Sequence, residues 1–437
     1  MSLTITVVGC GYLGAVHAAC MVELGHTVVG IDVDSAKVEG LNKATSPFFE
    51  PGLDDLLERT LATGRLRFSD DASQVAGADV VFVCVATPQR LGELAADVSF
   101  VDGAFAAVGQ HTSGPVLVVG KSTVPVGTAS RLAADLAETA PHVQVAWNPE
   151  FLREGHAIDD TLRPDRLVFG VQDPSAEALL RRVYETPIGG GTPVVVTDYE
   201  TAELVKVSAN AFLATKISFI NAMAEVCEIA GADVTELAEA LGYDDRIGRR
   251  FLNAGLGFGG GCLPKDIRAF MARAGEMGAD QALTFLREVD AINMRRRSRM
   301  VDLAREECGG SFVGKKVAVL GAAFKPHSDD IRDSPALNVA AQIRLQGGAV
   351  VVTDPEAVEN ARRLWPDLTY AETAEGACRG ADVVLLLTEW PQFTGLDPVA
   401  VGELVRARKV LDGRNALDPA RWRAAGWSYR ALGRPRA

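Results

Sequence analysis

The chain has 437 residues, of which 48% are hydrophobic and 23% charged, and its formal net charge is −13. A chain of this length and composition can bury more than one hydrophobic core, so we expect two or three domains. The acidic balance argues against a nucleic-acid partner, because phosphate backbones require clustered lysine and arginine.

The seven cysteines show no paired spacing that would indicate a disulfide framework or a metal site. The N-terminal residues do not have the pattern of a signal peptide, and no stretch reaches the roughly 18 consecutive apolar residues of a membrane span. We therefore expect a protein of the reducing cytoplasm with neither a metal nor a membrane partner.

The segment TITVVGCGYLG near the N-terminus predicts a strand, a tight turn and a helix. Gly9, Gly11 and Gly14 have the GxGxxG spacing that allows a pyrophosphate to approach the backbone closely. Asp32 ends the next predicted strand roughly 20 residues beyond Gly11, where a carboxylate can accept the ribose hydroxyls of NAD and disfavour NADP. Lys37 is close enough to weaken that preference. We expect NAD; the alternative is a Rossmann unit without a nucleotide.

The strand pattern of the first third occurs again in the last third. The first copy continues through HTVVGIDVD and GADVVFVCVATP, and the second copy reads KKVAVLGAAF, GGAVVVTDP and GADVVLLLTEWP. Short, wholly apolar strands that alternate with helices predict an α/β protein with two Rossmann-like, doubly wound parallel sheets. The second copy lacks the glycine fingerprint, so we do not expect it to bind a dinucleotide in the same way.

Two polar segments come directly after predicted strands of the first copy. STVPVGT comes after VLVVG and places Thr123 where its hydroxyl can lie beside a nicotinamide. NPEFLREG comes after VQVAW and places Glu150 and Glu154 at the carboxyl end of a strand. Ligands of open α/β sheets bind at this edge, although each segment could also be ordinary loop chemistry.

Two helices are predicted between the copies. Residues 201–230 contain neither proline nor glycine and carry Lys206 and Asn210 four residues apart, on one face of a long helix. Residues 283–308 form a second such run, whose arginine cluster we interpret as a solvated face or a subunit contact. We therefore expect three domains, with residues 1–196, 197–309 and 310–437.

The segment GLGFGGGCLPKD contains Cys262 directly after a run rich in glycine. Glycine lets a backbone approach its surroundings closely, and Pro264 restricts the backbone just after the cysteine, so we expect the thiol to be exposed rather than packed. The Lys265 ammonium favours thiolate over thiol, and Asp266 adds a carboxylate. The alternative is a flexible linker with an incidental cysteine.

The second copy places long cations near predicted strand ends. Lys325 and Arg332 lie in FKPHSDDIRDSP, and Arg414 lies in LDGRN. Such side chains suit a diphosphate, although each could instead form an ordinary surface salt bridge.

Six segments together resemble the UDP-glucose/GDP-mannose family of nucleotide-sugar dehydrogenases, and within it the UDP-glucose 6-dehydrogenases. They are GCGYLG, STVPVGT, NPEFLREG, AELVKVSANAFLATKISFINAMAEVC, DDRIGRRFLNAGLGFGGGCLPKD and AAFKPHSDDIRDSP. The resemblance covers nearly the whole chain. It implies an N-terminal NAD-binding domain, a central helix at a homodimer interface, and a C-terminal domain that holds the nucleotide of the sugar substrate.

The resemblance implies oxidation of a sugar CH2OH to a carboxylate by two hydride transfers to two NAD molecules. Cys262 would add to the intermediate aldehyde, and the thiohemiacetal would be oxidised to a thioester that water hydrolyses. Lys206 and Asn210 would stabilise oxyanion character, and Asp266 would assist proton transfer. Thr123 with Glu150 would position water or act as acid and base.

The resemblance also implies two sets of binding residues, which we expect to line one cleft that closes between domains. The cofactor set is Gly9, Gly11, Tyr12, Leu13, Gly14, Asp32, Lys37, Thr87, Thr123, Glu154, Lys265 and Arg332. The nucleotide-sugar set is Glu150, Phe151, Leu152, Arg153, Glu154, Lys206, Asn210, Arg246, Phe251, Leu252, Asn253, Ala254, Gly255, Gly259, Lys325 and Arg414.

Several alternatives stay open. The stretch QRLGELAADVSF resembles the family only loosely, and no motif distinguishes uracil from thymine, so dTDP-glucose or a UDP-N-acetyl sugar are alternative substrates. A β-hydroxyacid-type dehydrogenase with a single oxidation would share the Rossmann domain without needing Cys262. A non-catalytic nucleotide-sugar sensor would tolerate the loss of Cys262 and Lys206.

Overall fold

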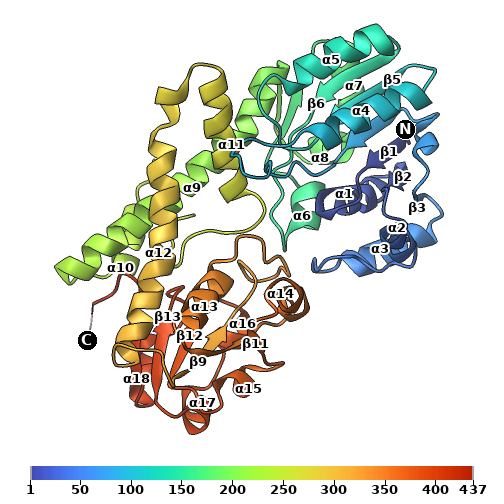
Figure 1. Ribbon diagram of the computed structural model, residues 1–437. Coiled ribbons are helices and arrows are strands. Elements are labelled where there is room, and N and C mark those ends of the chain that lie inside the picture. Colours follow the sequence, from blue (N-terminus) through green and yellow to red (C-terminus); the bar gives the residue numbers. More distant parts are fainter. Residues whose placement is uncertain (1, 436–437) are drawn as a thin grey trace. The chain divides into compact units, whose positions relative to one another are not determined.

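The computed structural model describes residues 2–435 and forms two compact units. The N-terminal unit comprises residues 1–209 and 268–278, and the C-terminal unit comprises residues 210–267 and 279–437. Two of the three divisions fall inside helices, α9 (Tyr199–Ala230) and α11 (Leu263–Glu276), and the third follows the end of α11. Helix α9 is the long central helix expected from the sequence (Figure 1).

An eight-stranded sheet forms the centre of the N-terminal unit. Its strands lie in the order β3-β2-β1-β4-β5-β6-β7-β8, and the first six give the 3-2-1-4-5-6 order of a doubly wound fold. The strands are β1 (Thr4–Val8), β2 (Thr27–Ile31), β3 (Leu66–Ser69), β4 (Val80–Val83), β5 (Val116–Gly120), β6 (Val143–Trp147), β7 (Leu167–Gly170) and β8 (Val194–Thr197).

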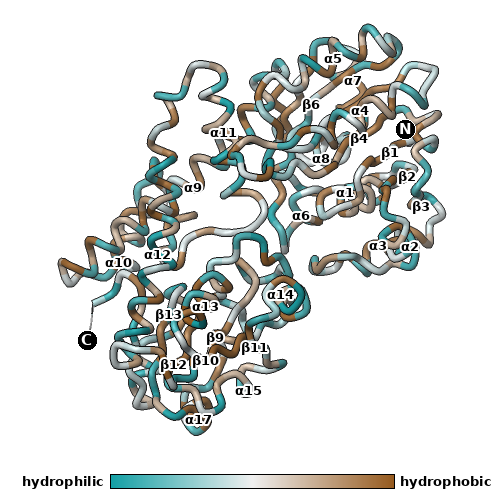
Figure 2. Tube along the Cα trace, in the orientation of Figure 1, coloured by the Kyte–Doolittle hydropathy of each residue, from teal (hydrophilic) through white to brown (hydrophobic). Residues whose placement is uncertain are grey.

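Helices cover both faces of this sheet and make two cores. The helices are α1 (Tyr12–Glu23), α2 (Ser35–Asn42), α3 (Leu53–Ala62), α4 (Ser99–His111), α5 (Thr128–Thr139), α6 (Ala157–Leu162), α7 (Pro174–Val183) and α8 (Glu185–Gly189), with the 3-10 turn η1 (Ala72–Val75). One core packs α1, α3 and α7 against the sheet, and the other packs α4 and α5. Strands that are buried on both faces favour apolar side chains throughout, which explains the brown run of β4 in Figure 2.

The end of this sheet departs from the expected parallel arrangement. β7 is antiparallel to β6, with Trp147 opposite Gly170, and β8 then runs parallel to β7. The only helix between β6 and β7 is the six-residue α6, which is too short to cross the length of a strand, so the chain returns in the opposite direction.

The C-terminal unit contains a wholly parallel six-stranded sheet in the order β11-β10-β9-β12-β13-β14, which repeats the 3-2-1-4-5-6 order. Its strands are β9 (Lys316–Leu320), β10 (Ala349–Thr353), β11 (Thr369–Tyr370), β12 (Val383–Leu386), β13 (Lys409–Asp412) and β14 (Ser428–Ala431). The predicted pair of related Rossmann-like units is therefore confirmed.

The helices of the C-terminal unit include the second predicted helix, α12, which spans Phe285–Glu307. The others are α10 (Val234–Gly242), α13 (Pro335–Leu345), α14 (Val358–Leu364), α15 (Ala374–Cys378), α16 (Pro391–Thr394), α17 (Pro398–Leu404) and α18 (Pro419–Ala424), with the 3-10 turn η2 (Asp280–Leu283). Within residues 2–435, no helix is both long enough and apolar enough to cross a membrane.

Glu203 of α9 caps another helix of the N-terminal unit. Its two carboxylate oxygens accept hydrogen bonds from the backbone N–H groups of Gly127 and Ala129, both at 2.7 Å, where α5 begins. The side chain is only 2% exposed, and burial raises the pKa of Glu203 to about 7 against the opposing effect of the two amides. The carboxylate therefore fixes the C-terminal end of the STVPVGT segment, where α5 begins.

Stability should depend on pH through Glu203. Because its pKa rises from 4.5 to about 7 on folding, the stabilising contribution is fully present below pH 4.5 and is lost as pH rises through 7. Glu203→Gln does not titrate, so wild type should lose about 3 kcal/mol of unfolding free energy relative to the variant between pH 4.5 and pH 8. Urea unfolding at several pH values measures this difference; a constant difference would contradict the assignment.

Candidate active site

The three glycines of the fingerprint have distinct surroundings between β1 and α1. Gly9 has a φ of 89°, which favours glycine, and a Cβ on Gly14 would overlap the carbonyl oxygen of Gly9. A Cβ on Gly11, by contrast, would meet no atom within 4 Å. The turn is therefore tight at Gly9, packed at Gly14 and open at Gly11, as close approach of a pyrophosphate to a helix N-terminus requires.

Asp32 lies directly after β2 and is only 8% exposed. Its Oδ2 accepts hydrogen bonds from the Cys10 backbone N–H and from the Lys37 Nζ, each at 2.8 Å, and its Oδ1 accepts one from the Asp34 N–H at 3.0 Å. A carboxylate has about four acceptor sites, so one remains for a ribose hydroxyl, and movement of the Lys37 side chain would free another.

The two threonines predicted at cofactor positions lie together. The Thr87 hydroxyl donates to the backbone carbonyl of Thr123 at 2.9 Å, and Ser122 bonds the carbonyl of Val85 at 2.6 Å. Arg273 of α11 donates to the carbonyl of Val126 at 2.9 Å. The segment after β5 is thus attached on both sides, which fixes the position of Thr123.

NPEFLREG forms an anchored turn after β6. Glu150 Oε1 accepts the backbone N–H groups of Phe151 and Leu152 at 2.7 and 2.9 Å. The Phe151 ring lies 3.9 Å from the Arg166 guanidinium and 5.6 Å from the Lys206 Nζ. Two predicted substrate residues, Phe151 and Lys206, are therefore brought together.

The rest of this turn is linked to the fingerprint helix. Buried Glu50 bonds the Tyr12 hydroxyl and accepts the Gly155 N–H at 2.6 Å. Leu152, like Leu13 of α1, packs against the core. Arg153 forms a two-point ion pair with Asp160, at 2.9 and 2.6 Å. Both side chains of the turn therefore have contacts within the N-terminal unit. Sequence reasoning did not identify Glu50, although it immediately precedes the turn residue Pro51.

The glycine-rich segment of the C-terminal unit is packed, not flexible. Residues 254–260 are buried, whereas Cys262 is exposed. Added Cβ atoms would overlap the carbonyl oxygen of Asp333 at Gly259 and the guanidinium of Arg332 at Gly261, and would lie 2.8 Å from the Phe324 ring at Gly260. These close contacts contradict the flexible-linker alternative.

Predicted catalytic residues of the C-terminal unit surround the first turn of α11. Asp266 is 3% exposed; its Oδ2 accepts from Asn210 Nδ2 at 2.6 Å, and its Oδ1 accepts from Lys265 Nζ at 2.7 Å. The Asp266 N–H donates to the Cys262 carbonyl at 2.9 Å. Cys262, Asn210, Lys265 and Asp266 are thus neighbours, and Lys206 lies one turn before Asn210 on α9.

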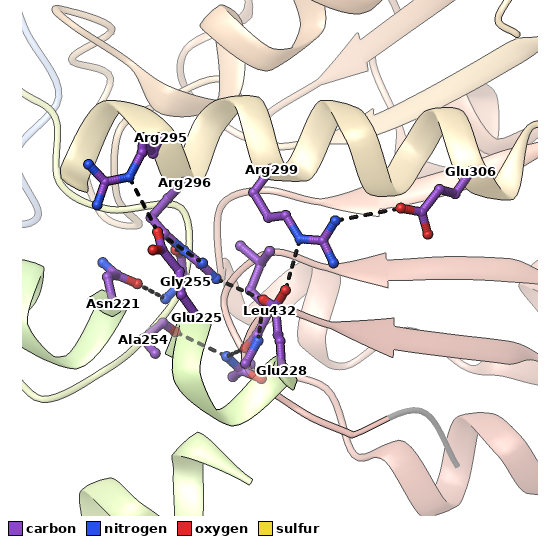
Figure 3. A network of polar contacts seen from close by, with 12 residues as sticks. Asn221, Glu225, Glu228, Ala254, Gly255, Arg295, Arg296, Arg299, Glu306 and Leu432 are labelled. Atoms are coloured by element: carbon purple, nitrogen blue, oxygen red, sulfur yellow. Dashed lines mark hydrogen bonds and ion pairs between the residues drawn. The ribbon is translucent and has the colours of Figure 1, made fainter. Parts of the chain in front are cut away.

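Two arginines of α12 are buried, whereas the sequence analysis interpreted the arginine cluster as a solvated face or a subunit contact. Arg296 and Arg297 are 0% and 1% exposed, so the cluster is not simply a solvated face, whereas Arg295 remains 52% exposed. Figure 3 shows Glu228 of α9 between the guanidinium groups of Arg296 and Arg299. Ion pairing of this kind makes the burial of Arg296 possible, and sequence periodicity alone does not reveal it.

The same helix holds the glycine-rich segment. The Asn293 side chain accepts from the Phe258 N–H at 2.7 Å and donates to the Phe258 carbonyl at 3.0 Å. Arg297 also donates to that carbonyl at 3.2 Å, and Asn221 of α9 accepts from the Gly255 N–H at 2.9 Å (Figure 3). Buried backbone groups are thereby satisfied by side chains rather than by water.

The predicted cations of the second Rossmann-like copy have partners within the C-terminal unit. Arg414 donates to the carbonyls of Leu387, Gly257 and Phe324 at 2.8, 3.0 and 3.1 Å. Arg332 pairs with Asp330 at 2.7 Å, and the Lys325 Nζ lies 5.4 Å from the Phe324 ring. These contacts position the side chains beside the glycine-rich segment.

The predicted substrate residues that precede this segment differ in exposure. Arg246 is 89% exposed and pairs with Asp244 at 2.6 Å. Phe251 has a φ of 66°, and Asn253 accepts from Arg249 at 2.8 Å. Leu252 and Ala254 are buried with residues of α9 and α10. Within residues 2–435, no group of three or more His, Cys, Asp or Glu side chains could hold a metal ion.

Three family models match the chain along its length. They are the NAD binding domain (residues 3–188), the central domain (200–295) and the UDP binding domain (318–419) of the UDP-glucose/GDP-mannose dehydrogenase family.

Named relatives match over almost the whole chain. The UDP-glucose 6-dehydrogenase of Rhizobium meliloti (strain 1021) is 41% identical over 99% of this chain and 100% of its own length. That of Rickettsia conorii is 40% identical over 99% of each. Among solved structures, the UDP-glucose dehydrogenase of Pyrobaculum islandicum matches with a TM-score of 0.91 at 39% identity, over 99% of this chain and 98% of that one. The UDP-D-ManNAc dehydrogenase of Pyrococcus horikoshii matches with a TM-score of 0.87 at 27% identity, over 100% of both.

Two alanine substitutions should separate packing from nucleotide binding. Gly14→Ala should destabilise the protein by about 3 kcal/mol, because the methyl group overlaps the Gly9 carbonyl. Gly11→Ala should leave stability unchanged but weaken NAD binding at least tenfold, because the methyl group occupies the open approach. Urea unfolding and titration with NAD measure both effects; wild-type affinity in Gly11→Ala would exclude this site.

Proposed function

Since the chain belongs to the UDP-glucose/GDP-mannose dehydrogenase family, we propose that it oxidises the C6 hydroxymethyl group of UDP-glucose to the carboxylate of UDP-glucuronate, with two molecules of NAD as acceptors. The observation that carries this proposal is Cys262, an exposed thiol at the end of a buried, close-packed glycine-rich segment. A dehydrogenase that stops after one oxidation has no need of such a thiol.

The NAD-binding residues fit this cofactor. NAD accepts a hydride, and the chain's part is to bind and orient it. Gly11 leaves the backbone open to the pyrophosphate, Asp32 keeps an acceptor for a ribose hydroxyl, and Thr123 is fixed where a hydroxyl can contact the nicotinamide. Lys37, which donates to Asp32, places a positive charge in the same part of the NAD site.

Cys262 supplies the nucleophile between the two oxidations. The first hydride loss from C6 gives an aldehyde, and the Cys262 sulfur adds to its carbonyl carbon to give a thiohemiacetal. Loss of the second hydride from that carbon gives a thioester, and water then adds as the carbon–sulfur bond breaks. The carboxylate leaves and the thiol is restored.

Polar side chains on α9 and α11 stabilise charge during these steps. Asn210 donates one amide hydrogen to Asp266 and keeps a second for the oxygen on C6. Asp266, held by Asn210 and Lys265, assists proton transfer, and Lys206 carries a positive charge one helical turn away. Thr123 and Glu150 position the hydrolytic water.

We assign the nucleotide to the third of three domains, which comprise residues 1–196, 197–309 and 310–437. Arg414, which donates to the Gly257 carbonyl, and Lys325, which lies beside the Phe324 ring, both belong to that third domain and suit a diphosphate. The reaction belongs in the cytoplasm, because seven cysteines without the spacing of a disulfide framework suit a reducing compartment.

We also propose that α9 forms a homodimer interface. Phe212, Phe219 and Val226 are 67%, 49% and 55% exposed and recur every seven residues, which is the spacing of a helix-pairing seam. Sedimentation equilibrium should therefore give twice the monomer mass, and Phe212→Glu with Phe219→Glu should give monomers. A wild-type monomer would contradict the interface.

The assay of the proposed reaction counts NADH produced per sugar. Wild type should form two NADH for each UDP-glucose consumed. Cys262→Ala should form no UDP-glucuronate and should still bind NAD, because its side chain lies outside the fingerprint turn. Cys308→Ala, which removes a buried thiol after α12, is the matched control and should keep both NADH. Normal acid formation by Cys262→Ala would refute the thioester route.

A substrate panel tests the nucleotide and the sugar in the same assay. UDP-glucose is compared with dTDP-glucose, UDP-N-acetyl sugars and β-hydroxyacids at equal concentration. We expect the highest kcat/KM for UDP-glucose. One NADH per substrate would instead indicate a single-oxidation dehydrogenase, and none with any compound would indicate a sensor.

A further inference from the structure

A buried lysine, Lys121, lies directly after strand β5. Its backbone N–H donates to the carbonyl of Val83 on β4 at 3.0 Å, and its side chain is only 4% exposed. The Nζ lies 3.1 Å from Asn148 Oδ1, 3.4 Å from the Tyr184 hydroxyl and 3.1 Å from Glu150 Oε2. The three donor positions of an ammonium group are thus directed at three oxygens.

The ammonium is held in its charged form. Burial acts to lower the pKa of Lys121, but the Glu150 carboxylate, with Tyr184 and Cys84, outweighs this effect and raises the pKa above the usual value for lysine. Removing two charges from water is costly, so a buried ion pair contributes little net stability compared with apolar side chains of similar volume. The pair is therefore better explained by what it holds in place.

The group that Lys121 holds in place is the Glu150 carboxylate. Lys121 contacts its Oε2, while its Oε1 accepts the N–H groups of Phe151 and Leu152, so both oxygens are fixed. The Phe151 ring in turn lies 5.6 Å from the Lys206 Nζ. A continuous path leads from the end of β5 through Glu150 and Phe151 to Lys206.

We propose that Lys121 is a positioning residue of the reaction, which keeps the Glu150 carboxylate oriented and thereby sets the position of Phe151 beside Lys206. This inference rests on the proposed function, in which Glu150 and Lys206 act on the substrate. Lys121 itself touches neither the sugar nor the cofactor in this proposal.

Four titratable side chains around the pair are neutral near pH 7. Burial raises the pKa of both Cys84 and Tyr184 to about 12, and burial also raises that of Cys20. Burial and the charge of Lys121 hold the pKa of His17 well below its usual range. None of these four side chains therefore competes with Glu150 as an anionic partner of Lys121.

The first test is Lys121→Met, which retains the volume of the side chain without its charge. We expect kcat with UDP-glucose to fall at least tenfold, while the dissociation constant for NAD changes less than twofold. The KM for UDP-glucose should change less than threefold, because Lys121 contacts Glu150 and not the nucleotide. A kcat within twofold of wild type would overturn the proposal.

Tyr184→Phe is the matched control. It removes a hydroxyl that contacts Lys121 and Asn148 from the same buried cluster but leaves the ion pair intact. If Lys121 acts only on local packing, both variants should lower stability and kcat to a similar extent. If Lys121 positions Glu150, only Lys121→Met should lower kcat at least tenfold; an equal loss in Tyr184→Phe would contradict the proposal.

A double variant covers the case in which Lys121→Met fails to fold. Lys121→Met with Glu150→Gln removes both charges, so no unpaired carboxylate remains. Its kcat should lie within twofold of that of Glu150→Gln alone, because Lys121 acts through Glu150. A further tenfold loss would show that it acts in another way.

Failure of the proposed function is distinguishable from failure of this inference. If wild type forms no NADH with any sugar of the panel, the proposed reaction is wrong. The urea midpoints of wild type, both single variants and the double variant then decide separately whether the pair is coupled. Additive midpoint shifts would overturn the role of Lys121 even if the enzyme is active.

Discussion

The burial of the glycine-rich segment is the constraint on which the chemistry of the C-terminal unit depends. Without side chains, Gly259, Gly260 and Gly261 let the backbone pack directly against neighbouring groups, and this contact leaves its polar atoms without access to water. Asn293, with Arg297, supplies the missing partners at Phe258. Cys262 is exposed at a defined place because the backbone before it is immobilised by these contacts.

The two Rossmann-like units show how one turn can serve two purposes. Asp32 and Asp354 both come directly after the second strand of their units and accept backbone N–H groups from the turn after the first strand. Asp354 also accepts hydrogen bonds from the backbone N–H groups of Ala323, Glu356 and Ala357. The Trp390 indole N–H donates to it as well, at 3.1 Å. Its acceptor capacity is filled, whereas Asp32 keeps room for a ribose hydroxyl. This difference agrees with the loss of the fingerprint in the second copy.

Much of the fold could be predicted because strand burial and helix periodicity are local properties. The repeat predicted two similar sheets, and the breaker-free run predicted α9 almost to its ends. Burial of long cations could not be predicted in this way, because Arg296 and its partner Glu228 lie far apart in sequence. Lys121 left a weak signal, since a lysine directly after a wholly apolar strand is unusual, but its partner Glu150 becomes visible only when β5 and β6 are paired.

The contrast among the cysteines has a practical consequence. Six of the seven are buried, and Cys262 alone is exposed. An electrophile such as iodoacetamide would therefore alkylate one position of the native protein and report its accessibility by a single mass increment. The same exposure makes this sulfur the first target of peroxide, so oxidative inactivation would begin at the atom that forms the thioester.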